Sequence, residues 1–444
     1  MSPVLVKVIQ LFLSLSLLIV LHELGHFIPA KLFKTRVEKF FLFFDVKFAL
    51  FKKKIGDTVY GIGWLPLGGY VKISGMIDES MDKAQMAEEP KPWEFRSKPA
   101  WQRLIIMVGG VTVNLVLGFL IYMMILFFYG RTIVEPETLS NGYAVAEQME
   151  QYGFRNGDKI LKANGKPLED ANDINRFLLV RDVKNVDVVH ADGTAEVLQI
   201  PDSIGDYIFK EGVRLPFTPR FKSTILDSVV AGKPAAKLGI RENDKILSVN
   251  DQPITYWDEF NTIVKQNKGK EMQVVYERGA VRDTVSLATG DDGVVGVYVK
   301  IDRDAFGEEK EIEYSFGQAI SKGFSFGYWT LHDYVAQFKY IFTKKGASQL
   351  GGFGTITSLY PSTWDWEGFW YTTALISIIL AFMNILPIPA LDGGHVMFLL
   401  YEIIAGRKPS DKFMEYAQMT GFFILIALLL YANGNDLYRW LFDK

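Results

Sequence analysis

His22-Glu-Leu-Gly-His26 stands inside a long apolar stretch near the start of the sequence, covering about residues 5–28. About 20 mainly apolar residues suffice for a helix to cross the hydrocarbon core of a bilayer, so this stretch predicts a membrane-spanning helix. Imidazole and carboxylate side chains are costly inside such a helix and usually serve a function there. These five residues therefore predict both a membrane fold and the position of a site.

The composition of the chain also indicates a membrane protein. Of 444 residues, 49% are hydrophobic, 14% are aromatic and 22% are charged, a balance too apolar for disorder and unusually apolar for a soluble enzyme. The net charge of −3 offers no basic face to a phosphate backbone, so we expect no nucleic-acid partner. The sequence contains no cysteine, which excludes disulfides, thiolate catalysis and cysteine-ligated metals.

Three further stretches are long and apolar enough to span a bilayer, at 104–129, at 369–391 and between Glu415 and Asp436. The loop 31–103 carries 14 Lys and Arg against 9 Asp and Glu, and the short connection before the fourth span is also basic. Basic loops tend to stay in the cytoplasm. We therefore expect both termini, and the long segment that follows the second span, on the other side of the membrane.

The long segment is polar and rich in short Val and Ile alternations, which indicates soluble β structure. Residues 153–168 recur as residues 239–254, with eight of sixteen positions identical at an offset of 86. An offset of that size predicts two compact domains in tandem, since solenoid repeats are shorter. The repeated stretch resembles a PDZ domain of the bacterial protease type, which implies binding of an extended peptide at a sheet edge.

The expected fold is thus an α-helical polytopic membrane protein with four transmembrane helices, a membrane-associated β-hairpin or sheet, and two tandem extracytoplasmic PDZ domains. The segments that we expect are a first span at 1–30, a cytoplasmic loop with a β-sheet and an interfacial helix at 31–103, a second span at 104–129, two PDZ domains at 130–220 and 221–303, interfacial or linker helices at 304–367, a third span at 368–392, a cytoplasmic-side helix or loop at 393–415, a fourth span at 416–435 and a C-terminal tail at 436–444.

The pattern His22-Glu-x-x-His26 carries the chemistry. On a helix the two imidazoles lie one turn apart and face the same way, so they can hold one metal ion beside Glu23. Zinc suits imidazole ligands, and a catalytic zinc needs three protein ligands and an open position. Glu23 can then take a proton from water as general base.

The third ligand is expected near the end of the third span, in Asn384-Ile-Leu-Pro-Ile-Pro-Ala-Leu-Asp-Gly-Gly-His395. The two prolines must end the helix, and irregular backbone at membrane depth is tolerated only where protein or a water-filled cavity surrounds it. Asp392 and His395 are both chemically suitable, and the residues themselves leave that choice open. The other histidines, His190 and His332, are interpreted as surface or packing residues.

Two stretches of the basic loop, at 43–51 and 58–73, are apolar and punctuated by glycine, and a polar turn at 52–57 separates them. A cut in a transmembrane helix requires unwinding, which exposes backbone groups that a strand edge can pair with. We therefore expect this sheet to bind the unwound substrate, through Gly68, Gly69 and Tyr70. The alternative is a hairpin that only packs against the protein.

The two motifs and their order resemble the site-2 protease family of intramembrane metalloproteases, in particular its bacterial regulator of sigma-E protease type. The resemblance implies that His22, His26 and Asp392 bind Zn²⁺, that Glu23 is the catalytic base, and that Asn384 binds the substrate backbone. It also implies a bacterial inner-membrane enzyme that cleaves transmembrane segments of single-pass proteins, such as anti-sigma factors and remnant signal peptides. The oligomeric state stays open.

The chain departs from the pattern of that family in the second span. Members of the family commonly have Gly-Pro-x-x-Asn there, whereas this chain has Gly110-Val-Thr-Val-Asn114. Two rival functions remain: a catalytically silent membrane scaffold that binds peptide termini through PDZ domains, and a metal or proton transporter. Transporters are often built from inverted repeats, and the four spans of this sequence show none, which argues against the transporter hypothesis.

Overall fold

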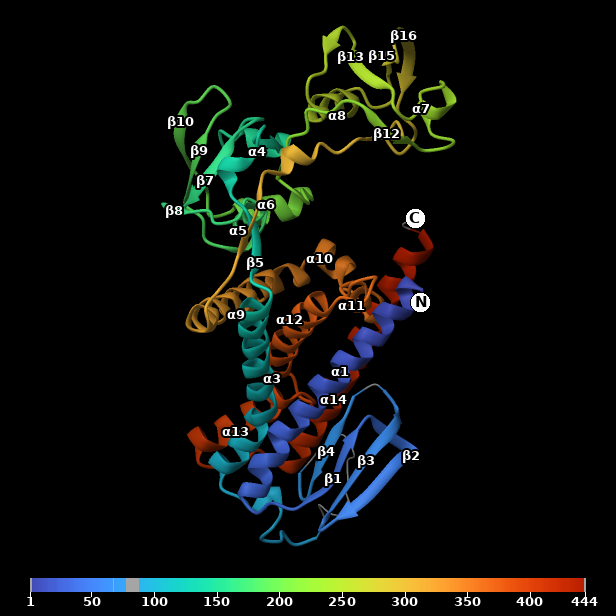
Figure 1. The fold of residues 1–444 in the computed structure, drawn as a ribbon. Coiled ribbons are helices and arrows are strands. Elements are labelled where there is room, and N and C mark those ends of the chain that lie inside the picture. Colours follow the sequence, from blue (N-terminus) through green and yellow to red (C-terminus); the bar gives the residue numbers. More distant parts are fainter. Residues whose placement is uncertain (1, 67, 77–87, 443–444) are drawn as a thin grey trace. The chain divides into compact units, whose positions relative to one another are not determined.

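The computed structural model describes residues 2–66, 68–76 and 88–442, so Leu67 of the expected substrate strand and the last two residues of the expected tail lie outside the described part. The chain divides into two compact units (Figure 1). The first consists of Met1–Gly130 and Glu313–Lys444, and the second of Arg131–Ile312.

The first unit is mainly helical. Its helices are α1 (Pro3–Leu32), α3 (Ala100–Phe128), α9 (Phe316–Phe338), α10 (Lys344–Gln349), α11 (Phe353–Ser358), α12 (Trp366–Ile385), α13 (Asp392–Ala405) and α14 (Asp411–Phe442), with short 3-10 turns at Phe95–Ser97 and Lys339–Phe342. Among the described residues, four helices are long and apolar enough to cross a membrane: α1, α3, α12 and, from Lys412 on, α14. The expectation of a four-span membrane protein is confirmed at this level.

The last helix extends further than we expected. α14 runs through residues 436–442, which we had assigned to a C-terminal tail. Its final turns are held by polar contacts, since Asp436 accepts hydrogen bonds from the backbone N–H groups of Gly352 and Thr355 and pairs with Arg439 at 2.7 Å. A polar sequence that makes such contacts can stay helical after the apolar stretch has ended.

The third span breaks at its two prolines, as the sequence predicted. α12 ends at Ile385, and Leu386 has an extended backbone with ψ of 142°. Proline lacks the N–H that would continue the helical ladder. The chain then turns and starts α13 at Asp392, so that this aspartate is the first residue of a new helix.

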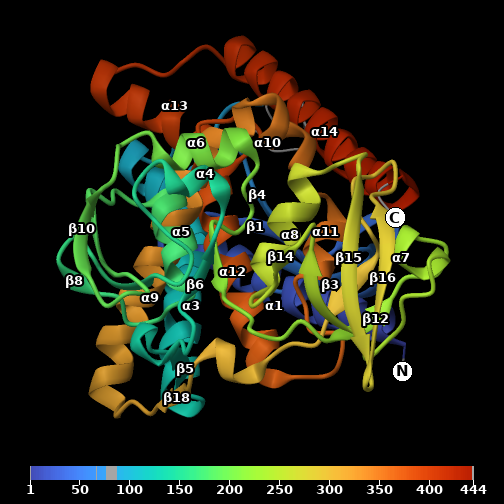
Figure 2. The same ribbon diagram turned by 90° about the horizontal axis from the view of Figure 1, so that it is seen from above.

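Helices α1, α3 and α12 pack together in the membrane unit, whereas α14 lies at the periphery of that unit (Figure 2). The side chains of α14 are accordingly the least buried of the four spans, with 11% of its most apolar window buried against 44% for α12. Apolar side chains exposed on such a helix suit contact with lipid.

A four-stranded sheet lies beside α1 (Figure 1). It contains β1 (Val37–Leu42), β2 (Phe44–Ile55), β3 (Thr58–Leu65) and β4 (Tyr70–Ile73), in the order β2-β3-β1-β4. β1 and β3 are parallel, and the other two pairs are antiparallel. β4 is consequently an edge strand of this sheet.

Two details of this sheet differ from the sequence-based expectation. The segment 52–57 is not a polar turn, because Lys52–Lys54 continue β2 and the pairing reaches Ile55 opposite Thr58. A two-residue turn at Gly56 and Asp57, with Gly56 at φ of +61°, then suffices to reverse the chain. β1 was not predicted, and its parallel partner β3 lies beyond β2 in the sequence.

The second unit holds many short elements. Its strands are β5 (Arg131–Val134), β6 (Tyr143–Val145), β7 (Lys159–Ala163), β8 (Lys166–Pro167), β9 (Asn185–Val189), β10 (Ala195–Gln199), β11 (Phe217–Pro219), β12 (Leu226–Val229), β13 (Lys245–Val249), β14 (Gln252–Pro253), β15 (Glu271–Arg278), β16 (Val281–Ala288), β17 (Val297–Val299) and β18 (Glu309–Ile312), and its helices are α4 (Glu147–Glu150), α5 (Asp173–Val180), α6 (Ile204–Glu211), α7 (Pro234–Lys237) and α8 (Trp257–Gln266). It also has 3-10 turns at Pro136–Thr138 and Arg303–Phe306.

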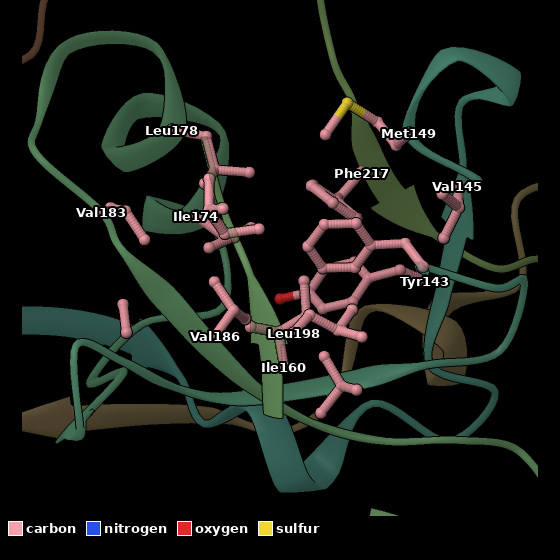
Figure 3. Packing of buried hydrophobic residues seen from close by; sticks show 14 of the residues in the cluster. Tyr143, Val145, Met149, Ile160, Ile174, Leu178, Val183, Val186, Leu198 and Phe217 are labelled. Carbon is pink, nitrogen blue, oxygen red and sulfur yellow. The ribbon is translucent and has the colours of Figure 1, made fainter. Parts of the chain in front are cut away.

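The unit is built from two halves, each with its own apolar core. The core of the first half includes Phe154 and Tyr143, and Figure 3 shows Tyr143 with Ile160, Phe217 and, from α5, Ile174 in the same cluster. The second core is formed around Phe260, Met272 and other buried residues of β13, β15 and α8.

The sequence repeat occupies equivalent positions in the two halves. Each half has a four-stranded sheet of the same order, β10-β9-β7-β8 and β16-β15-β13-β14. The repeated Asn164 and Asn250 both have positive φ and form the turn of a short hairpin. The two halves therefore share one strand order and place the repeated asparagine at the same hairpin turn.

Candidate metal centre

His22, His26 and Asp392 meet inside the membrane unit. The two histidines lie one turn apart on α1, and Asp392 begins α13 directly after the proline break. The Nε2 atoms of the histidines are 3.2 Å apart, and Asp392 Oδ2 lies 3.2 Å from His22 Nε2 and 3.4 Å from His26 Nε2. Among the described residues, these three form the group of His and acidic side chains that could hold a metal ion.

The geometry of these three donors fits zinc. Zn²⁺ takes imidazole nitrogen and carboxylate oxygen at roughly 2.0–2.1 Å, and tetrahedral ligands at that radius lie about 3.3–3.4 Å from each other. The observed spacings of 3.2–3.4 Å match this value. Asp392 Oδ2 is also buried and has no hydrogen-bond partner in the described part of the chain, so an oxygen lone pair is available in the middle of the group.

Neighbouring groups of α3 contact the far side of each imidazole. The backbone carbonyl of Ile106 lies 2.8 Å from His26 Nδ1, and Asn114 Nδ2 lies 3.2 Å from His22 Nδ1. Sequence reasoning assigned no role to Ile106 or Asn114. Every residue has a backbone carbonyl, so the sequence carries no signal for the contact of Ile106. The single side-chain amide in an otherwise apolar span is a signal that could have identified Asn114.

Glu23 lies beside the three donors in the same cavity. This cavity has a volume of about 710 Å³, and its lining includes His22, Glu23, His26, Asp392 and His395. The backbone amide of Val71 in β4 hydrogen-bonds to the Glu23 carboxylate. His395 thus lines the cavity but is not a member of the three-residue group that could hold a metal.

Three of the four residues expected to contact substrate line this cavity. Asn384, Gly69 and Tyr70 line the cavity, whereas Gly68 is not among its lining residues. A Cβ atom on Gly69 would lie 2.5 Å from Ile19 and 3.6 Å from Glu23 Cγ, so glycine lets β4 approach α1 at the site. The Tyr70 hydroxyl donates to Asp45 at 2.6 Å.

Comparison with known proteins identifies the family. The model of peptidase family M50 matches residues 10–428. The chain is 28% identical to the regulator of sigma-E protease RseP of Salmonella typhimurium, over 99% of this chain and all of that protein. It is 26% identical to RseP of Escherichia coli over 96% of this chain and 97% of that protein.

A protein of Neisseria meningitidis that is named as a zinc metalloprotease is 27% identical to the chain, over 96% of this chain and 98% of that protein. The family match begins within α1 and ends within α14, and it includes both histidines and Asp392 of the metal centre. The chain therefore belongs to peptidase family M50 and is a zinc metalloendopeptidase of the site-2 protease family.

Proposed function

We propose that this protein is an intramembrane endopeptidase that cleaves transmembrane segments of single-pass membrane proteins. The observation that carries the proposal is the position of His22, His26 and Asp392, whose donor atoms lie within 3.4 Å of one another although two apolar helical segments far apart in the sequence supply them. A hydrolytic centre between membrane-spanning helices suits a substrate that is itself a membrane helix.

In this proposal His22, His26 and Asp392 are the three protein ligands of zinc. Bound zinc supplies Lewis acidity, which polarises a peptide carbonyl and makes water a nucleophile at neutral pH. Glu23 lines the same cavity and acts as the general base, since its carboxylate oxygen can accept the proton of the attacking water and pass it to the leaving amine. The surrounding apolar helices limit the access of other water to the site.

Substrate binding is proposed for β4 and for Asn384. A helix that unwinds for cleavage exposes N–H and C=O groups, which cost several kcal/mol each in a lipid-like setting unless they are paired. β4 is an edge strand beside the cavity and can pair with an extended segment. Gly69 and Tyr70 belong to this binding edge, Gly68 shapes the loop that leads into it, and Asn384 offers an amide to the substrate backbone.

The two halves of the second unit are proposed to be PDZ domains, with boundaries near 130–220 and 221–303. Their shared strand order and the sequence repeat support this assignment. The basic loop 31–103 supports an orientation in which these domains and both termini lie outside the cytoplasm of a bacterium, with the four spans in its inner membrane. There the domains would bind peptide termini or restrict entry of bulky substrates.

The substrate class is proposed from the relatives. Two of them are named as regulators of sigma-E protease, which suggests anti-sigma factors as substrates, and remnant signal peptides are a second group of single-pass helices of suitable size. Both groups contain a single apolar helix that could enter a bundle from the lipid phase.

Substitution of Glu23 by Gln tests the proposal. A reconstituted single-pass substrate should be cleaved by the native protein, and Glu23→Gln should reduce the rate by about 100-fold or more while zinc content is unchanged. The reason is that glutamine keeps the shape of the side chain but cannot accept the proton. Undiminished cleavage by this variant would contradict the proposal, and absence of cleavage by the native protein would favour a peptide-binding scaffold.

A further inference from the structure

Asn114 lies beside the metal centre and nothing above gives it a role. Its side chain is 1% exposed and its Nδ2 atom is 3.2 Å from Nδ1 of His22, a residue of a different helix. The other side-chain atom, Oδ1, is buried and has no hydrogen-bond partner among the described residues. A buried amide oxygen without a partner is costly, so it calls for an explanation.

The two histidines differ in what faces their Nδ1 atoms. The carbonyl of Ile106, 2.8 Å from His26 Nδ1, can only accept a hydrogen bond. His26 must therefore carry its proton on Nδ1, which leaves a lone pair on Nε2 for a metal ion. His22 has an amide in the equivalent place, and an amide can either donate or accept.

The orientation of the Asn114 amide sets the tautomer of His22. With Nδ2 facing His22, the imidazole must accept at Nδ1 and carry its proton on Nε2, where it blocks coordination. A rotation of the amide by half a turn exchanges its oxygen and nitrogen at almost no change in shape. Oδ1 then accepts a hydrogen bond from Nδ1–H of His22, the amide nitrogen takes the former place of the oxygen, and the Nε2 lone pair points at Asp392 and His26.

We propose that Asn114 is a positioning residue that fixes His22 as a metal ligand through Nε2, because its amide oxygen accepts a hydrogen bond from the Nδ1–H group of His22. The proposal rests on the ligand set given under Proposed function. Residues that hold the outer nitrogen of a ligating histidine set its ring orientation and its basicity, and their loss typically costs about 10- to 100-fold in metal affinity.

The backbone around Asn114 supports a positioning role. Ser377 of α12 donates to the backbone carbonyl of Asn114 at 2.7 Å, so a third helix anchors this turn of α3. One turn earlier in α3, a Cβ atom on Gly110 would lie 2.7 Å from His22 Cε1. The backbone of α3 can therefore approach the imidazole closely enough for the amide to reach Nδ1.

The test compares Asn114→Leu with Asn114→Asp in the full-length protein in detergent. Leucine has a similar size but no acceptor, so zinc affinity measured by chelator competition should fall by about 10-fold or more. Aspartate offers carboxylate oxygens that accept from Nδ1–H, so affinity should stay within a few-fold of the native value. In cobalt-loaded protein, only the leucine variant should change its visible absorption spectrum.

The matched control is Ser377→Ala, which removes a hydrogen bond to the same turn of α3 and leaves the His22 contact in place. This variant should bind zinc like the native protein. Native zinc affinity in Asn114→Leu would overturn the proposal, and so would an equal loss in Asn114→Leu and Asn114→Asp. His22→Ala separates the two hypotheses. If His22 is not a zinc ligand, this variant should retain zinc, which would refute the proposed ligand set and not only the role of Asn114.

Discussion

Gly25 of α1 and Gly109 of α3 meet with no room for a side chain on either backbone. A Cβ atom on Gly25 would lie 2.5 Å from the carbonyl oxygen of Gly109 and 2.7 Å from Cα of Gly110. Small residues permit such close crossings of membrane helices. The crossing is the reason that a backbone carbonyl and an amide of α3 reach the imidazoles of α1, so the metal centre depends on it.

Gly110→Ala is expected to damage the metal centre directly. The added methyl group would collide with His26 Nε2 and would lie 2.7 Å from His22 Cε1, so both donor atoms must move. Overpacking of this kind costs roughly 1–3 kcal/mol, and displaced donors lose affinity for the ion. Zinc content after dialysis against a weak chelator should fall well below that of the native protein.

The control for that change lies in the same helix. Gly118 faces α12, where an added Cβ atom would lie 2.7 Å from Ile378 Cγ1 and 3.2 Å from the Ala374 carbonyl oxygen, so it would be crowded to a similar degree but away from the imidazoles. Gly118→Ala should therefore retain zinc. Equal zinc retention in both alanine variants would show that the crossing does not support the metal centre.

The proposed pairing of substrate with β4 predicts a cross-linking pattern. The native chain has no cysteine, so single cysteines can be introduced without background. Tyr70→Cys in β4 should form a disulfide with a cysteine near the cleavage position of a trapped substrate, in the Glu23→Gln background. Phe48→Cys in β2, which is 57% exposed at the opposite edge of the sheet, should not. Preferential cross-linking of the Phe48→Cys variant would place the substrate beside β2 and would contradict its pairing with β4.

The two halves of the second unit differ in how they neutralise one buried aspartate. In the first half, His190 Nδ1 lies 2.7 Å from Asp158 Oδ1. In the second half, Asp244 is at the repeated position, and its Oδ1 accepts a hydrogen bond from Arg278 Nε at 2.7 Å. His190 is itself buried, which agrees with a packing residue, one of the two interpretations expected for it. Only the first half therefore depends on a cation that can lose its proton near neutral pH.

This difference predicts a pH dependence of the first half alone. Hydrogen bonds to Glu196 and then Asp158 raise the pKa of His190, while burial and nearby Arg155 oppose the rise. A raised pKa means that protonated His190 stabilises the folded state fully below the ordinary value of about 6.5. This stabilisation is lost as pH rises through the raised pKa.

Hydrogen exchange of the full-length protein, corrected for the intrinsic rate at each pH, measures this effect. Protection of the amides of β7 and β9 should fall as pH rises above the raised pKa of His190, while protection in β13 and β15 should not. His190→Gln should abolish the pH dependence of the first half. Parallel pH responses in the two halves would refute the assignment.

Much of this architecture was predictable because it rests on local patterns. Long apolar runs predicted the four spans, and the two prolines after Asn384 predicted where the third one breaks. The repeat predicted two similar halves, and the structure gives both the same strand order. The His-Glu-x-x-His spacing alone implied that both imidazoles share one face of a helix.

Other features depend on contacts between distant segments, which no local pattern contains. Asp392 and His395 are separated by one turn of α13, and only the packing of α13 against α3, which also packs against α1, brings the aspartate to the histidines. Asn114 reaches His22 across 92 residues because glycines allow two helices to cross closely. β1 was missed for a related reason, since its partners follow it in the sequence and one of them runs parallel.

The zinc content of Asp392→Asn and His395→Ala, purified side by side with the native protein, tests the central claim most directly. Our account places the metal between His22, His26 and Asp392. It predicts that Asp392→Asn loses most of its zinc, whereas His395→Ala keeps about one ion per chain like the native enzyme. Loss of zinc from the histidine variant, with native content in the asparagine variant, would contradict the account.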